Sequence, residues 1–251
     1  MGAVAVAVVG AGAAVALVGS SDGSGADRPS LPPPRDPAFV VGKPPTLNSA
    51  HTSEWASVAG AVVARRAPAA SAAAVARVPA LTPEGTGNIV QVLGRRLRAG
   101  RLWLDVRLPS GAAGLHGWLP RKALSGYGFV RTRLVVDRAR LRATLLRNGR
   151  PVFRAPVGVG RPEAPTPAGD FYIRNRLTRY ASPAYGPVAF GTSARSDQLT
   201  DWPAGGFIGI HGTDQPALLP GRVSHGCIRM RNGSIRELER LMPIGTPLTI
   251  R

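Results

Sequence analysis

The chain has 251 residues, enough for one or two domains, and it carries a formal net charge of +18 at pH 7. Of its 32 basic Lys and Arg residues, only Lys43 and Lys122 are lysines. This charge attracts polyanions, but no basic helix, zinc finger or RNA-binding signature accompanies it, which argues against a nucleic-acid-binding protein. An acidic polymer or an anionic lipid remains as a partner for such a surface.

The N-terminal segment is apolar, with a continuous Gly-rich run over Ala3–Val18. A helix of this length extends about 24 Å, which is less than the ~30 Å hydrocarbon core of a bilayer. We therefore expect residues 1–19 to be a signal peptide or a membrane anchor that contacts the membrane, and we expect an exported protein. The alternative is a buried strand or helix.

A Gly-, Ser-, Pro- and Asp-rich stretch follows over Ser20–Ser49. It has too few hydrophobic residues to fold alone. Proline-rich chains of this kind act as semi-extended spacers. We therefore interpret residues 20–56 as a flexible linker.

Short runs of β-forming residues, separated by turns, occupy residues 57–127. Short strands at this spacing are typical of a small barrel. The expected strands are Val62–Arg65, Ala74–Val78, Asn88–Leu93, Leu102–Leu108 and Gly117–Pro120. Trp103 and Trp118 lie on these strands, either as ligand-stacking residues or, as is more frequent for aromatic residues on alternating strands, as part of the core.

Strands also dominate the second half of the chain. The expected strands are Arg133–Val136, Arg140–Arg147, Pro151–Val157, Gly169–Arg174 and Thr246–Ile250. A turn near Asp137 joins the first two as a hairpin. The single convincing helix is Ser234–Leu241, where apolar residues recur at helical spacing and Pro243 ends the pattern.

The only cysteine, Cys227, lies in a Ser-His-Gly-Cys sequence that includes His225, and a second histidine, His211, precedes it in a His-Gly-Thr sequence. One thiol cannot form an intramolecular disulfide. A thiolate nucleophile needs a base that removes its proton and a group that holds the base. Because two histidines and a Gly-rich turn surround this thiol, we interpret Cys227 as reactive, with a space-filling buried cysteine as the alternative.

These paired motifs resemble the signature of the L,D-transpeptidase catalytic domain, a family of bacterial enzymes that cross-link peptidoglycan through a cysteine. Val157–Gly160, Thr166–Phe171 (Thr-Pro-Ala-Gly-Asp-Phe) and Asn232 agree with the same family. The resemblance covers residues 131–251. It implies a β-rich catalytic domain with one or two helices that acts on peptidoglycan stem peptides.

The resemblance also implies the catalytic roles. Cys227 forms a thioester, His211 is the base, and the carbonyl of Gly212 holds its ring. A carbonyl that accepts one ring N–H fixes the tautomer of the imidazole. His225 is expected either to position the thiol or to line the donor side of the site. We expect the N–H groups of Gly226 and Cys227 to form an oxyanion hole, in which glycine avoids a Cβ clash.

Three further residues are candidates for substrate binding. Arg229 can hold a substrate carboxylate in bidentate fashion, with an ordinary surface arginine as the alternative. Ser224 is expected to make hydrogen bonds within the motif or to the substrate. Asn232 follows the cysteine in the family pattern and completes the candidate site.

A second resemblance concerns the first strands. Trp103–Leu108 (Trp-Leu-Asp-Val-Arg-Leu) and Gly117–Pro120 (Gly-Trp-Leu-Pro) resemble a bacterial SH3-like domain. The predicted fold class is mainly β, with a small SH3-like barrel at residues 57–127 followed by the L,D-transpeptidase-type catalytic domain at residues 131–251. We expect the protein at the cell wall or the extracytoplasmic face of the membrane, where its charge contacts anionic cell-wall polymers and the catalytic domain alone performs the chemistry.

Other interpretations stay open. Two histidines and a thiol are zinc ligand types, but the contiguous His225-Gly226-Cys227 is a poor chelating spacing, so we expect no metal and no cofactor. An L,D-carboxypeptidase or another cysteine amidase would use the same thioester and release it with water. A non-catalytic cell-wall-binding protein is a further alternative, and the presence of both His211 and Cys227 argues against it.

Overall fold

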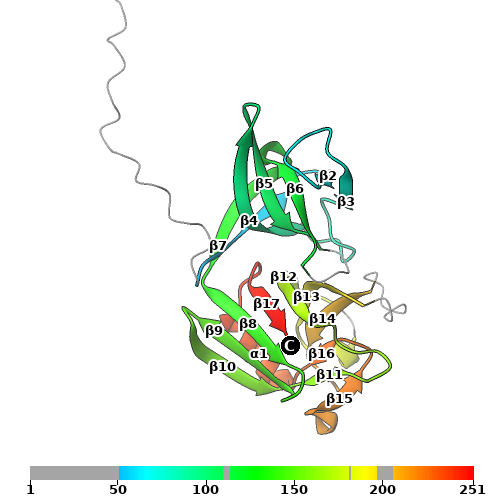
Figure 1. Ribbon diagram of the computed structural model, residues 1–251. Helices are drawn as coiled ribbons and strands as arrows, with labels where there is room; N and C mark the ends of the chain where they lie inside the picture. Colours follow the sequence, from blue (N-terminus) through cyan, green and yellow to red (C-terminus); the bar gives the residue numbers. More distant parts are fainter. Residues whose placement is uncertain (1–50, 110–113, 181, 197–205) are drawn as a thin grey trace, which may run out of the picture. The chain divides into compact units, whose positions relative to one another are not determined.

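The computed structural model describes residues 51–109, 114–180, 182–196 and 206–251, and these residues are mainly β, as predicted. The predicted signal peptide or anchor at residues 1–19, and the predicted linker as far as residue 50, lie outside the described residues. The described strands belong to two sheets, one of seven strands and one of ten (Figure 1). In the part of the chain that the structure describes, no helix is long and apolar enough to cross a membrane.

The first sheet has the strand order β3-β2-β6-β5-β4-β1-β7. Its strands are β1 Ser53–Val58, β2 Val62–Arg65, β3 Ala74–Val78, β4 Ile89–Arg98, β5 Arg101–Arg107, β6 His116–Pro120 and β7 Leu124–Val130, with a single 3-10 turn, η1 Arg121–Ala123, before β7. Its core holds Val90, Leu104 and Leu119, which are completely or almost completely buried. The inward and outward alternation expected of a strand with one buried face is clearest in β1.

The first sheet extends beyond its predicted limits at both ends. Strand β1 begins at Ser53, so the last residues of the predicted linker (20–56) are part of the sheet. Strand β7 ends at Val130, past the predicted end at residue 127. Strand β1 was not recognised in the sequence, because the buried position at Glu54 holds a charged residue. Glu54 forms an ion pair with Arg95 in place of an apolar contact.

The second sheet has the order β10-β9-β8-β17-β12-β13-β14-β16-β11-β15. Its strands are β8 Thr132–Asp137, β9 Arg142–Arg147, β10 Arg150–Pro156, β11 Gly158–Gly160, β12 Gly169–Leu177, β13 Ala189–Arg195, β14 Phe207–His211, β15 Gly221–Ser224, β16 Ile228–Arg229 and β17 Pro247–Ile250. Two single 3-10 turns, η2 Pro183–Tyr185 and η3 Pro216–Leu218, lie in its connections. The terminal strand β17 is in the interior of the sheet, parallel to β8 and antiparallel to β12.

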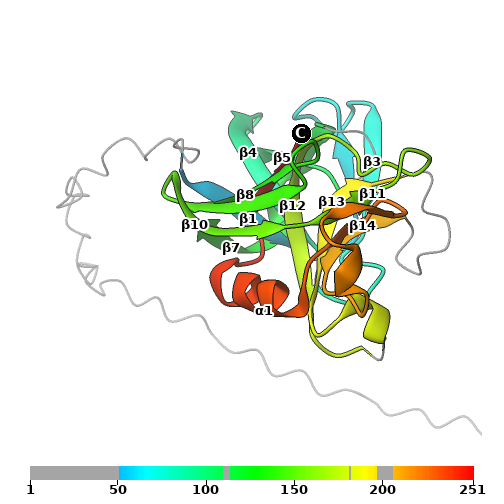
Figure 2. The same ribbon diagram turned by 90° about the horizontal axis from the view of Figure 1, so that it is seen from below.

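The predicted helix is α1, Asn232–Leu241, which begins two residues earlier than expected (Figure 2). Ile235 and Leu238 are fully buried and belong to the same core as the apolar residues of the second sheet. The chain leaves the helix through Pro243 and a turn at Gly245 with φ of +79°. A side chain is strained at such a φ, and a Cβ at Gly245 would also lie 2.0 Å from Trp55 Cδ1.

Side chains of β12 form hydrogen bonds with the first half of the chain. The Tyr172 hydroxyl donates to the carbonyl of Ile89 at 2.9 Å, and Arg174 Nη2 pairs with Glu84 Oε1 at 3.1 Å. Asn175 Nδ2 donates to the other oxygen of Glu84, also at 3.1 Å. The described residues from 51 onward accordingly group as one compact unit that includes both sheets.

Candidate active site

Cys227 lies in a tight turn between β15 and β16. Gly226, which precedes it, has φ of +123°, and a Cβ at this position would lie 2.9 Å from Ile208 Cδ1. Only glycine adopts this backbone conformation without strain. The turn leads directly into β16, so the Cys227 side chain is held at the end of a strand and is only 7% exposed.

Ser224 stabilises this turn through hydrogen bonds to its backbone. Its hydroxyl donates to the carbonyl of Cys227 and accepts the N–H of Gly226 at 3.1 Å, and the residue is 1% exposed. Its polar group is therefore used within the turn, which matches the expected hydrogen bonds in the motif and not a substrate contact. The N–H of Gly226 was also expected in the oxyanion hole, but in this structure it is donated to Ser224.

Thr166, from another segment of the chain, stabilises the same turn. Its hydroxyl accepts the N–H of Gly160 and donates to the carbonyl of Gly226, both at 2.8 Å, and the residue is 1% exposed. Thr166 thus joins the end of β11 to the cysteine turn. The sequence placed Thr166 in a family segment without assigning it a role, because its partner Gly226 is 60 residues away.

His211 ends β14, and its ring is fixed by its neighbour. Nδ1 lies 2.6 Å from the carbonyl oxygen of Gly212. Because a carbonyl only accepts hydrogen bonds, Nδ1 carries the proton and Nε2 keeps the lone pair of a base. The predicted partner of the ring is therefore the observed one.

Burial controls the charge of His211, which is 2% exposed. Desolvation lowers its pKa to about 4, the hydrogen bond to Gly212 opposes this shift, and the positive charge of Arg229 adds to it. The imidazole is consequently neutral near pH 7 and available to accept a proton.

The strand register brings His211 and Cys227 to one place. β14 and β16 are parallel neighbours, with Ile210 opposite Ile228. Gly209 and Cys227, each one residue earlier, are therefore side by side, and the N–H of Gly209 donates to Cys227 Sγ at 3.3 Å. A Cβ at Gly209 would lie 3.6 Å from His211 Cδ2 and 3.8 Å from Cys227 Sγ, so both groups border the space that this glycine leaves empty.

Tyr185 and Asn232 stabilise the His211 ring and the backbone next to it. The ring of Tyr185 meets the His211 ring edge-on, with 4.7 Å between centroids and an interplanar angle of 75°. Asn232 Oδ1 accepts the N–H of Thr213 at 3.0 Å. Gly212 packs so closely against Asn232 that a Cβ there would lie 2.3 Å from Oδ1. Asn232, expected to bind substrate, thus holds the backbone that holds His211, and Tyr185 was not predicted by any motif.

His225 and Arg229 occupy different surroundings. His225 is exposed, and its Nε2 accepts a hydrogen bond from Arg161. This hydrogen bond differs from one predicted role of the ring, which was to position the thiol. Arg229 is half-buried near His211, and its Nε has no hydrogen-bond partner among the described residues. A buried guanidinium N–H of this kind can bind an anion.

The described ranges, with their gaps at 110–113, 181 and 197–205, contain no group of three or more His, Cys, Asp and Glu side chains that could hold a metal ion. The ring nitrogens that would ligate a metal are partly used already, since Nδ1 of His211 donates to Gly212 and Nε2 of His225 accepts from Arg161. The arrangement is a buried thiol, a neutral base of fixed tautomer and a nearby cation. It is suited to nucleophilic acyl transfer by a cysteine.

Sequence comparison relates the second half of the chain to a known family. Residues 131–250 match the family model described as YkuD, the L,D-transpeptidase catalytic domain, which confirms the domain predicted for this part of the chain. The chain is 37% identical over 107 residues to the candidate L,D-transpeptidase YkuD of Bacillus subtilis (strain 168), covering 43% of this chain and 58% of the relative. It is 35% identical over 95 residues to the protein of the same name from Bacillus licheniformis, covering 38% of this chain and 50% of the relative. The chain thus spans about half the length of the curated relatives that it matches.

Solved structures of similar proteins were also found. The catalytic domain of an L,D-transpeptidase from E. faecium is 26% identical, with a TM-score of 0.38, and the similarity covers 48% of this chain and 96% of that chain. An L,D-transpeptidase from Mycobacterium smegmatis is 14% identical, with a TM-score of 0.39 and coverage of 64% and 99% of the two chains.

Proposed function

We propose that this protein is an L,D-transpeptidase that cross-links peptidoglycan stem peptides through a thioester on Cys227. The observation that carries the proposal is that the His211 ring and the Cys227 thiol both lie next to Gly209, 3.6 and 3.8 Å from where its Cβ would be, with Nδ1 of His211 fixed by the Gly212 carbonyl. This leaves Nε2 as the only proton acceptor of the ring. The match of residues 131–250 to the L,D-transpeptidase catalytic domain supports the same reaction class.

The first half-reaction is acylation of the thiol. His211 removes the proton of Cys227, the sulfur attacks a peptide carbonyl, and a tetrahedral oxyanion forms. The C–N bond then breaks, the departing D-amino acid takes the proton from the imidazolium, and a thioester remains. The N–H of Cys227, whose peptide plane is fixed by the turn that Ser224 and Thr166 hold, is our proposed donor to the oxyanion.

The second half-reaction transfers the acyl group to an amine. The amine of an acceptor stem gives one proton to His211 as it attacks the thioester, and the sulfur leaves as the C–S bond breaks. The imidazolium returns that proton to the sulfur. One peptide bond is broken and one is formed, which needs no oxidant, metal or nucleotide.

Arg229 links substrate binding to the strength of the base. Its positive charge lowers the pKa of His211. A substrate carboxylate that pairs with Arg229 would compensate this charge and raise the pKa of His211. We therefore propose that the substrate increases the basicity of the group that acts on it, although burial remains the larger influence on His211.

The remaining parts of the chain have supporting roles in this proposal. We infer an exported protein at the cell wall or the extracytoplasmic membrane face, with residues 1–19 as its export signal or anchor. The first sheet is interpreted as the SH3-like module, on the basis of its Trp103–Leu108 and Gly117–Pro120 sequences. The net charge of +18 favours contact with anionic cell-wall polymers.

The test is mass spectrometry of isolated muropeptides incubated with the full chain. A new cross-linked dimer, formed with loss of a terminal D-amino acid, is the expected product. A trimmed stem without dimer would identify a carboxypeptidase, because water then resolves the thioester. No change with the native chain, or the same dimer with Cys227→Ala, would contradict the proposed mechanism.

A further inference from the structure

The first sheet contains an opening between β2 and β6. Four residue pairs join β2 to β3, but a single pair, Arg65 with Trp118, joins β2 to β6. A pocket of about 730 Å³ lies beside this sparsely paired part of the sheet, and residues of both strands line it. Its lining residues come from β2 and the residue before it, from β5, the end of β6, η1 and the β2–β3 connection, and none belongs to the Cys227 site.

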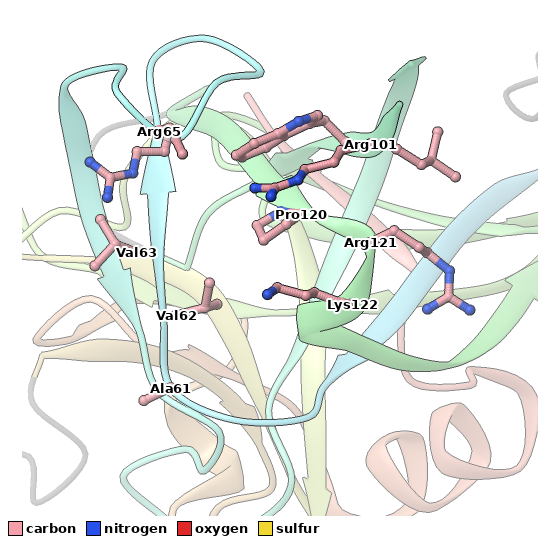
Figure 3. A pocket seen from close by; sticks show the side chains of 11 residues that line it. Ala61, Val62, Val63, Arg65, Arg101, Pro120, Arg121 and Lys122 are labelled. Carbon is pink, nitrogen blue, oxygen red and sulfur yellow. The ribbon is translucent and has the colours of Figure 1, made fainter. Parts of the chain in front are cut away.

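Apolar groups form much of this pocket. Val62 and Val63 of β2 are half-buried, as is Pro120 at the end of β6. Trp103 of β5 is 5% exposed and also lines the pocket. Figure 3 shows Val62, Val63 and Pro120 around the same space. Pockets of this size and composition suit ligands with small apolar groups.

Cations stand at the rim of the pocket, and its lining contains no Asp or Glu. Arg101 and Lys122 are exposed, and Figure 3 shows both side chains extending over the space beside Pro120. In the part of the chain that the structure describes, neither residue forms a salt bridge.

The other two cations of the lining are already engaged. Arg65 Nη1 donates to the carbonyl of Ala72 at 2.9 Å. Arg121 Nη1 donates to the carbonyl of Leu124 at 2.8 Å, and its guanidinium lies 4.7 Å from the centroid of the Tyr127 ring. Arg101 and Lys122 are therefore the charges that a ligand in this pocket would meet.

We propose that this pocket binds an extended acidic peptide with small apolar side chains. The peptide backbone pairs with the open edge of β2, as in the addition of a strand to a sheet edge. Its apolar side chains contact Trp103 and Pro120, and a carboxylate is held by Arg101 and Lys122 through charge-assisted hydrogen bonds. A phosphate polymer would need the same cations but neither the strand edge nor the apolar lining, so the peptide fits more of the site.

The experiment measures binding, not turnover, so it is independent of the proposed reaction. The probe is N-acetyl-Ala-Ala-Glu-Ala-Ala with a free C-terminus, titrated by calorimetry into the full chain carrying Cys227→Ala. The test variant adds Arg101→Gln and Lys122→Gln. The matched control adds Arg98→Gln and Arg154→Gln, which remove the same charge from exposed positions outside the pocket.

The pocket variant is expected to bind the probe at least about tenfold more weakly, because hydrogen bonds to charged groups are lost. The control variant is expected to stay within about twofold of the parent. A probe with Gln and an amidated C-terminus should also bind at least about tenfold more weakly. A probe with N-methylated alternate amides should bind more weakly as well, since strand pairing needs these N–H groups.

Lys122 offers a second readout, because it is the only lysine in the described residues. Bound probe should protect it from an amine-acetylating reagent, as measured by peptide mass spectrometry. Equal affinities of the pocket and control variants would overturn the proposal. So would loss of binding in Arg229→Gln but not in the pocket variant, or protection of Lys122 by inorganic phosphate but not by the peptide.

Discussion

Arg174 of β12 and Glu84, which lies between β3 and β4, form an ion pair of 3.1 Å that is almost completely withdrawn from solvent, with side-chain exposures of 1% and 11%. Arg174 also donates through Nε to the carbonyl of Thr192 at 2.7 Å, and its guanidinium lies 3.8 Å from the centroid of the Phe207 ring. Burial lowers the pKa of Arg174, and the charge of Glu84 opposes that shift. A residue before the second sheet thus supplies the counter-charge for a cation within it.

Removal of this counter-charge should destabilise the whole protein. We expect Glu84→Ala to lower the free energy of unfolding by about 3 to 5 kcal/mol, the usual cost of leaving one partner of a buried pair uncompensated. Urea unfolding followed by circular dichroism measures the change. Glu163→Ala, at an exposed acidic residue, is the control and should change stability by less than about 0.5 kcal/mol. Equal effects of the two substitutions would show that the pair is not structurally important.

The same contacts predict the behaviour of an isolated second half. The sequence suggested that residues 131–251 would perform the chemistry alone. In the structure, separation would remove the partners of Tyr172, Arg174 and Asn175, namely Ile89 and Glu84. We therefore expect residues 131–251 to be less stable than the full chain and to lose activity in proportion to their unfolded fraction. A thermal melt equal to that of the full chain would refute this coupling.

The neutral state of His211 predicts a pH-dependent stability. Its pKa is about 4 when folded, against an ordinary value of 6.5, so the unfolded chain binds more protons between these values. This contribution is complete above pH 6.5 and is lost as the pH falls towards 4. Between pH 7.5 and 4.5 the native chain should lose about 2 to 3 kcal/mol more stability than His211→Gln, measured by urea unfolding at both pH values. Parallel losses in the two proteins would mean that His211 is not buried as a neutral ring.

Gly209 should be required for activity but not for folding. A Cβ there makes ordinary contacts of 3.6 to 3.8 Å, so Gly209→Ala should fold with nearly native stability. The added methyl group would contact both the base and the nucleophile, and we expect at least about a tenfold loss of kcat because small displacements of reacting groups are costly. Gly94→Ala is the matched control, since its Cβ would also meet its nearest neighbour at an ordinary distance of 3.9 Å. Equal activity of both variants would place the reacting groups elsewhere.

The two histidines should differ in their effect on the thiol. His211→Ala should slow iodoacetamide labelling of Cys227 near neutral pH, because the ring that borders the thiol is lost. His225→Ala should have a small effect, since this ring is exposed and engaged with Arg161. The rate of labelling is followed by mass spectrometry. A larger effect at His225 would reverse the assignment of base and helper.

The sequence predicted what depends on local pattern. Short runs of β-forming residues located β2 and β3 with their observed bounds, and helical spacing located α1 within two residues. The resemblance to the L,D-transpeptidase family implied the Gly212 carbonyl as the partner of His211, and Nδ1 of His211 lies 2.6 Å from it. These features depend on residues that are close in sequence.

The parts that the sequence could not predict depend on distant partners. Strand β13, Ala189–Arg195, has six consecutive buried residues and thus no alternation to detect. Thr166 acquires its role only when Gly226 is brought beside it, and Tyr185 only when η2 is placed against the His211 ring. The hydrogen bond from the Gly226 N–H to the Ser224 hydroxyl likewise forms only when the turn is folded.

β14 and β16 are parallel neighbours, and their pairing places His211 opposite Arg229. This relative position is set by the strand pairing and not by the length of the loop that connects the two strands. Residues 214–218 in that connection are exposed and include η3. The catalytic pair and its connecting loop can therefore vary independently. Exchange of residues 214–218 for a longer or differently charged loop is therefore expected to change the surface beside the site while the strand pairing that positions His211 stays the same.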